Sequence, residues 1–181
     1  MKKRILTLIV LGVLSLLALC SCISDSGDGN SSIPGSGSSN ESKIFKSFVY
    51  KNVTIDLDTD YKPIIDKLGN PTALEEVPSC AFPSEIAYRI VYGDDIEMAA
   101  EPISGNKTHY IYSIVITNED LKTPEGIGLG NSFSEAVAVY GSNYTQKGEA
   151  YVYTQGKEFL YLFVRDDIIT QIQYLFDLEL T

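Results

Sequence analysis

The sequence contains few of the residues on which most metal and catalytic sites depend. Its 181 residues include a single histidine, His109, and three cysteines, Cys20, Cys22 and Cys80. Zinc sites usually need three or four Cys, His or acidic ligands at characteristic spacings. The spacing between Cys80 and His109 does not indicate a thiol–imidazole pair either. We therefore predict no metal, no cofactor and no catalytic residue.

Basic residues are also scarce, with 14 Lys and Arg against 24 Asp and Glu and a formal net charge of −10. Removal of an N-terminal signal would take away Lys2, Lys3 and Arg4 and no acidic residue. That leaves 11 basic against 24 acidic residues, a net charge of −13. Because such a charge repels phosphate backbones and anionic lipid, no nucleic-acid partner is expected.

No apolar run reaches the roughly 20 residues that a membrane-spanning helix needs. The longest run, from Ile5 to Leu19, directly follows the basic start Met1-Lys2-Lys3-Arg4. A basic start, an apolar segment of this length and small residues after it are typical of a secretory signal peptide. We predict a signal peptide over residues 1–21.

The end of the apolar run, Cys20-Ser21-Cys22, resembles the lipobox of bacterial lipoproteins. In that pattern the signal is cut just before a cysteine whose thiol is acylated, and the residue before the cut is small. Ser21 before Cys22 fits, whereas Leu19 before Cys20 does not. The resemblance implies lipidation of Cys22, with Cys20 or ordinary secretion as alternatives. Cys80 would then be the only cysteine of the mature domain, so no intrachain disulfide is predicted.

Residues 22–43 are predicted to form the lipid anchor and a disordered tether. Ile23–Ser42 is composed mainly of Ser, Gly, Asn and Asp, which cannot bury enough apolar surface to fold. A flexible coil of about 20 residues spans roughly 25 Å. The segment resembles the tether of surface lipoproteins of Gram-positive bacteria. This resemblance implies an extracytoplasmic protein of the cell envelope, lipid-anchored to the membrane, although the type of envelope stays open.

Residues 44–181 are predicted to form one α+β domain with an internal repeat. Ile55–Gly69 aligns with Ile127–Gly141 without a gap. In both segments, apolar residues recur at i, i+3, i+4 and i+7, which predicts a short amphipathic helix. Ser132 and Glu135 have the spacing of a capping box. The apolar positions are Tyr61, Ile64, Ile65 and Leu68 in the first segment and Phe133, Ala136, Val137 and Tyr140 in the second.

Strand-like runs follow each predicted helix, and a hairpin precedes the first one. We predict two tandem repeats, 44–121 and 122–181, each with a helix and three antiparallel strands. Together they would form one sheet with helices on one face. The predicted strands are Phe48–Tyr50, Val53–Leu57, Ile86–Tyr92, Ile96–Ala100, Tyr110–Thr117, Ala150–Thr154, Glu158–Val164 and Ile168–Phe176.

The second segment resembles the repeat of the β-lactamase-inhibitor-protein-like fold, which small outer-membrane assembly lipoproteins of the SmpA/OmlA type share. The chain also resembles uncharacterised tethered lipoproteins of clostridia, which carry a segment like Ser79–Phe82. Both resemblances imply a fold and neither implies an activity. The residues that carry the first are Ile127, Gly130, Ser132, Glu135, Ala136, Val137 and Gly141.

Two further motifs have simpler explanations than ligand binding. Asp56, Asp58 and Asp60 look like the start of a calcium loop, but an EF-hand would need Gly at 61 and Glu at 67. Helix capping by Asp60 explains this segment better. The glycines of 126–130 do not form a dinucleotide-binding fingerprint, because its third glycine is missing. We interpret them as the turn that enters a helix.

Tyrosines are the strongest functional signal in the predicted sheet. Side chains alternate between faces along a strand, so residues two apart share a face. A sheet with helices on one side leaves the other face open, and Tyr suits an open face that binds protein. We predict a non-catalytic, membrane-anchored surface lipoprotein that binds or scaffolds a protein or peptide. The alternatives are an extracytoplasmic enzyme using Cys80, such as a thiol-dependent hydrolase, or a carboxylate pair, and a small-ligand carrier. The candidate partner-binding residues are Tyr88, Tyr92, Tyr110, Tyr112, Tyr151 and Tyr153.

Overall fold

The computed structural model describes residue 45 and residues 47–82, 84–102 and 108–178. All of them belong to one unit of the chain, Ser39–Thr181. The predicted signal peptide, the lipidation site at Cys22 and the tether lie outside the described residues. Within the described ranges, every helix is too short or too polar to cross a membrane.

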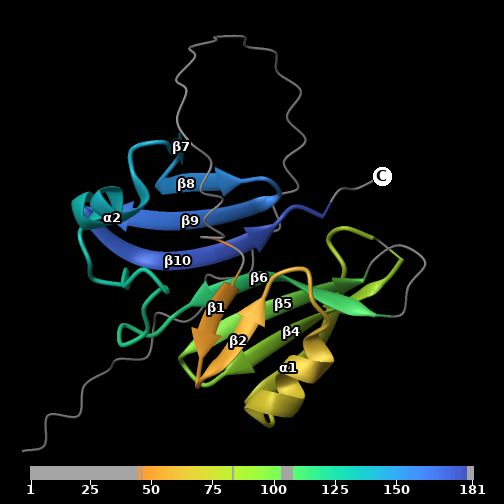
Figure 1. Cartoon of the computed structure of the whole chain (residues 1–181). Helices are drawn as coiled ribbons and strands as arrows, with labels where there is room; N and C mark the ends of the chain where they lie inside the picture. Colours follow the sequence, from red (N-terminus) through yellow and green to blue (C-terminus); the bar gives the residue numbers. More distant parts are fainter. Residues whose placement is uncertain (1–44, 46, 83, 103–107, 179–181) are drawn as a thin grey trace, which may run out of the picture. The chain divides into compact units, whose positions relative to one another are not determined.

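The described part of the chain consists of strands and two short helices (Figure 1). In chain order, the elements are β1 (Ser47–Tyr50), β2 (Val53–Asp56), α1 (Tyr61–Leu68), β3 (Ala73–Pro78), β4 (Ile86–Tyr92), β5 (Ile96–Pro102), β6 (His109–Ile116), α2 (Phe133–Tyr140), β7 (Thr145–Lys147), β8 (Ala150–Gln155), β9 (Glu158–Arg165) and β10 (Ile168–Phe176).

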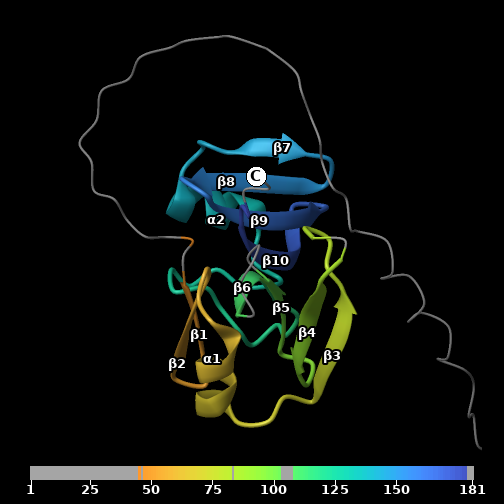
Figure 2. The same ribbon diagram turned by 90° about the vertical axis from the view of Figure 1, so that its right-hand side faces the viewer.

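Eight strands form one antiparallel sheet in the order β3-β4-β5-β6-β10-β9-β8-β7, and β1 and β2 form a separate hairpin. The centre of the sheet is the pairing of β6 with β10, where Ile116 faces Ile172 and Ile114 faces Tyr174. These four side chains are fully buried. The two edges of the sheet are β3 and β7 (Figure 2).

The predicted fold class is wrong. Instead of two tandem units of one helix and three strands, the described residues form a mostly antiparallel structure of an eight-stranded and a two-stranded sheet with two short helices. Strands β3 and β7 were not predicted. Both are edge strands whose side chains are largely exposed, so they lack the apolar alternation that marks a half-buried strand.

Both helices begin at the first and end at the last of the apolar positions predicted from the sequence, Tyr61 to Leu68 in α1 and Phe133 to Tyr140 in α2. The Asp60 side chain caps α1 by accepting a hydrogen bond from the Lys62 amide at 3.0 Å, which confirms the capping role of this residue. The capping box of Ser132 and Glu135 is present at the start of α2. Local side-chain chemistry therefore suffices to fix where these helices begin.

The core lies on the sheet face that contacts α1, α2 and the β1–β2 hairpin, which we call the packed face. Phe48 of the hairpin contacts Tyr174 of β10, with ring centroids 6.0 Å apart. Phe133, the first residue of α2, stacks on Tyr151 of β8 at 3.8 Å. The apolar stripe of each helix packs against this core.

A polar cluster holds the hairpin against the turn between β4 and β5. The Tyr50 hydroxyl donates a hydrogen bond to Asp95 Oδ2 at 2.5 Å, and Asn118 Nδ2 donates to Asp95 Oδ1 at 2.7 Å. The hydrogen bond from Tyr50, followed by that from Asn118, lowers the pKa of the Asp95 carboxyl. Both donors favour the charged form of this carboxylate, which anchors three separate segments of the chain.

Candidate binding face

The sheet face opposite the packed face contains a row of aromatic residues on β9. Along this strand, the buried Leu160 and Leu162 alternate with Phe159, Tyr161 and Phe163, which are half-buried. Because strand side chains alternate, the three aromatic residues point away from the core. Their neighbouring ring centroids are 6.3 Å apart, and the rings of Tyr161 and Phe163 are nearly parallel, at 22°. We call these three residues the β9 row and this side of the sheet the opposite face.

On one side of the β9 row, strand β10 contributes one apolar and two amide side chains. Phe159 pairs with Leu175, Tyr161 with Gln173 and Phe163 with Gln171. Paired residues of an antiparallel ladder lie on the same face. On the other side of the row, β8 contributes the buried Ala150 and Val152. The opposite face therefore has an apolar strip with hydrogen-bonding groups beside it.

Tyr112 of β6 lies on the same face as this strip, at a point where the pairing of β5 with β6 is irregular. Ala99 pairs with Ser113 and Ala100 with Ile111, so Tyr112 is an extra residue in its strand. Burial raises the pKa of Tyr112 to about 12, with smaller contributions from the charges of Glu101 and Glu97. Its phenol is therefore neutral at physiological pH and remains a hydrogen-bond donor.

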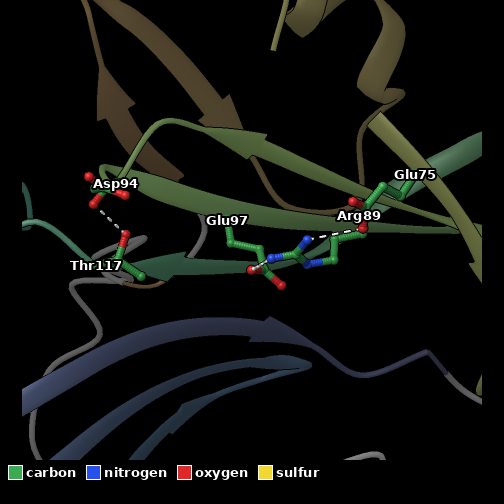
Figure 3. A network of polar contacts seen from close by, with 5 residues as sticks. All are labelled: Glu75, Arg89, Asp94, Glu97 and Thr117. Carbon is green, nitrogen blue, oxygen red and sulfur yellow. Dashed lines mark hydrogen bonds and ion pairs between the residues drawn. The ribbon is translucent and has the colours of Figure 1, made fainter. Parts of the chain in front are cut away.

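Next to Tyr112, the opposite face becomes charged. Arg89 of β4 lies between two carboxylates, with Nη2 2.6 Å from Glu97 Oε2 and Nη1 3.0 Å from Glu75 Oε2 (Figure 3). The hydrogen bond to Glu97 is the main factor that raises the pKa of Arg89. All three side chains are at least one-third exposed, so the pairs contribute little to stability. Together they present one net negative charge.

The buried carboxylate of Glu101 orders the loop that contains Cys80. Its Oε2 accepts a hydrogen bond from Ser79 Oγ at 2.5 Å, and its Oε1 accepts one from the Cys80 amide at 3.3 Å. Cys80 is disulfide-bonded in the full-length chain, which still has all three cysteines, so the absence of a disulfide in the mature domain stays a prediction.

His109 is used structurally. Its Nε2 is 2.9 Å from the Ile86 carbonyl oxygen, and its ring meets Tyr88 edge-on at 4.8 Å. Among the residues that the structure describes, no group of three or more His, Cys, Asp or Glu side chains has a metal-binding arrangement.

Two of the six candidate tyrosines, Tyr92 and Tyr153, belong to the core. They are 5% and 2% exposed, and so are out of reach of a partner. The Tyr92 hydroxyl donates to the carbonyl oxygen of Gly69 at 2.8 Å, and the Tyr153 hydroxyl donates to that of Gly141 at 2.9 Å. Each therefore ties a strand to the residue that ends a helix.

The other four candidates divide between the two faces. Tyr88 stacks on Tyr61 of α1 at 5.1 Å, and Tyr151 packs beneath α2, so both lie on the packed face. Tyr110 pairs with Glu101, which places it with Tyr112 on the opposite face. Alternation identified correctly which tyrosines share a face, but it could not show which face the helices cover.

The β9 row was missed in the sequence, although a signal for it exists. In Glu158–Arg165, aromatic residues occupy every second position and leucines stand between them. A strand that buries its leucines must turn its aromatic residues to the other side.

The structure resembles part of an extracellular protein containing an SCP domain from Bacillus anthracis str. Ames, with a TM-score of 0.52 and 11% sequence identity. The match covers 80% of this chain and 50% of that chain. A cysteine-rich secretory protein from Staphylococcus aureus subsp. aureus Mu50 has a TM-score of 0.46 at 12% identity, over 67% of this chain and 44% of that chain. This chain thus spans half or less of the length of these proteins, and at such identities the likeness concerns the fold alone. No family profile and no curated protein matches the sequence.

The fold shared with the Bacillus anthracis protein shows that the resemblance to the β-lactamase-inhibitor-protein-like, SmpA/OmlA-type repeat is wrong. The residues that suggested it, between Ile127 and Gly141, form a turn, a capping box and one helix with a terminal glycine. Such a motif describes a local structure that unrelated folds share, so it could not identify the family.

Proposed function

We propose that this chain is a non-catalytic, extracytoplasmic binding module that holds a protein or peptide partner on the opposite face of its sheet. The observation that carries the proposal is the β9 row, Phe159, Tyr161 and Phe163, which is half-buried and lies away from the helices. Aromatic side chains supply large contact areas, and they are enriched where proteins meet.

Tyr112 and Tyr110 complete the surface that we propose for the partner. The neutral phenol of Tyr112 offers a hydrogen bond beside the apolar strip. On β10, Gln171 offers an amide donor and acceptor, and Gln173, whose Nε2 donates to Ser113 Oγ at 2.9 Å, offers its carbonyl oxygen. An apolar centre with polar groups at its rim is the usual composition of a protein–protein interface.

Photocrosslinking in the native cell tests this proposal. A photoreactive phenylalanine analogue at position 161, on the β9 row, should form an adduct with a protein. The matched control is the same analogue at position 139, because Val139 is 45% exposed on α2, outside the proposed surface. Absence of an adduct at 161, or equal adducts at both positions, would contradict the proposal.

We place the module outside the cytoplasmic membrane, anchored through acylated Cys22. The signal-like residues 1–21 and the small residue before Cys22 support this assignment. The structurally similar Bacillus anthracis protein is an extracellular protein, which also supports this assignment. Two acyl chains would suffice for stable anchoring, since each buried CH₂ contributes about 0.8 kcal/mol.

The lipid anchor predicts metabolic labelling with a palmitate analogue. The native chain should incorporate the label, and Cys22→Ser should abolish incorporation and release the protein or leave it unprocessed. Cys20→Ser is the matched control and should still be labelled. Labelling that depends on Cys20 and not on Cys22 would show that the acylated residue is the other cysteine.

A further inference from the structure

Strand β3 is the edge of the eight-stranded sheet and has a neighbour on one side only, within the described ranges (Figure 2). An edge strand presents a row of backbone N–H and C=O groups that can pair with another strand. The other edge, β7, has only three residues, whereas β3 has six. Of the two edges, β3 is the one long enough to hold a peptide.

The backbone of β3 is regular and its side chains are accessible. All six residues pair with β4 in one unbroken register, from Ala73 opposite Val91 to Pro78 opposite Ile86. Bulges, which proteins use to prevent pairing at an edge, interrupt the β5–β6 and β9–β10 ladders instead. Leu74 is 48% exposed, and Glu75 and Glu76 are exposed beside it. A regular strand of this kind can accept another strand.

Charge determines which strand can pair with β3. If a second copy of this chain paired antiparallel about the middle of β3, either Glu75 or Glu76 would lie opposite its own counterpart in the other copy. Like charges that face each other across a ladder are destabilising, and each chain has a net charge of −10. Arg89 neutralises only part of the acidity, because it also binds Glu97. A second copy is therefore disfavoured and a basic strand is favoured.

We propose that the edge of β3 binds an extended basic segment of a protein partner by strand addition. The order of side chains on β3 specifies the segment. Leu74 and Val77 flank the two acids, so the complementary sequence is apolar-basic-basic-apolar. The main-chain hydrogen bonds supply affinity, and the side-chain order supplies specificity. This site lies at the edge of the sheet, away from the β9 row, and does not depend on the function proposed for that row.

The test titrates the full chain with an acetylated and amidated hexapeptide, Thr-Val-Lys-Lys-Val-Thr. The control peptide, Thr-Lys-Val-Val-Lys-Thr, has the same composition and charge, but its lysines and valines have exchanged positions. Amide hydrogen exchange, followed residue by residue, locates the bound peptide. The first peptide should slow exchange of outward-facing β3 amides by about tenfold at saturation, because exposed edge amides exchange readily when unpaired. The control peptide should bind about fivefold more weakly, since its lysines lose both glutamates.

Two variants with the same charge change separate pairing at β3 from general attraction to an acidic protein. Glu76→Lys should weaken binding of the first peptide by about fivefold, because it turns an attraction into a repulsion. Glu149→Lys alters the turn between β7 and β8, at the other edge of the sheet, and should leave binding unchanged. The proposal fails if saturating peptide leaves the β3 amides unprotected, if both peptides bind equally, or if both variants weaken binding equally.

Discussion

The tyrosines of this chain show that the role of a residue depends on its face and on where its hydroxyl lies. Tyr92 and Tyr153 have the same type of partner, the carbonyl oxygen of the glycine that ends a helix. Burial raises the pKa of Tyr153 to about 12. From the sequence they could not be distinguished from Tyr112, which lies on the opposite face. Their partners, Gly69 and Gly141, are identified only when the chain is folded.

Tyr92→Phe and Tyr153→Phe should each destabilise the domain by about 1 kcal/mol, because each change removes a hydrogen bond and leaves a carbonyl oxygen without that donor. Urea unfolding of the two variants measures the effect. Tyr161→Phe, on the opposite face, is the matched control and should stay within about 0.5 kcal/mol of the native chain. If the native chain and all three variants were equally stable, the hydroxyls of Tyr92 and Tyr153 would not tie the strands to the helix ends.

At the scale of elements, the reliability of prediction follows how local the determinants are. Helices α1 and α2 begin and end with the predicted apolar positions, because caps and apolar spacing are encoded within ten residues. Strand β10 was also predicted with its observed bounds. Edge strands β3 and β7 were missed, because an exposed strand has no buried face to leave a pattern in the sequence.

The capping box of α2 gives a prediction for this element. Ser132→Ala should destabilise the domain by about 1 kcal/mol, because the Ser132 hydroxyl no longer accepts a hydrogen bond from the Glu135 amide. Denaturant unfolding measures this loss. Ser134→Ala changes an exposed serine in the same helix turn, whose hydroxyl is 2.9 Å from Ser132 Oγ, and should cost much less, since the bond from the Glu135 amide remains and Ala favours the helix interior. If Ser134→Ala costs as much as Ser132→Ala, the cap is not what stabilises the start of α2.

At the scale of the whole molecule, the pairing of β6 with β10 joins the strands that follow α1 to those that follow α2. Repeat spacing alone could not predict this arrangement, because it depends on contacts between residues about 60 positions apart. Similar local segments therefore led to the wrong fold class. The β9 row, by contrast, lies within one strand, and its alternating pattern was visible in the sequence.

Buried tyrosines predict that the molecule loses stability in alkali. Burial raises the pKa of Tyr112 and of Tyr153 to about 12, and it also raises the pKa of Tyr140 and of Tyr174. An unfolded tyrosine ionises near pH 10. The folded state favours the neutral phenol, so this stabilisation is complete below pH 10 and declines as the pH rises from 10 towards 12.

Unfolding free energies between pH 8 and pH 11, together with the phenolate absorbance, check this prediction. Stability should fall above about pH 10, and some of the 12 tyrosines should ionise only as the protein unfolds. If all of them titrated near pH 10 without loss of structure, these phenols would not be buried as described.

The central claim is that the partner is held on the opposite face, and the affinity of two tyrosine variants tests it most directly. The measurement uses the protein that crosslinks at position 161, together with a melting curve for each variant. Tyr161→Ala should weaken binding by about 30-fold, corresponding to about 2 kcal/mol, with little change in melting temperature. Tyr151→Ala removes the ring that stacks on Phe133, so it should lower the melting temperature and leave the affinity of the folded protein unchanged. Normal binding by Tyr161→Ala, with loss of binding by a fully folded Tyr151→Ala, would contradict the account.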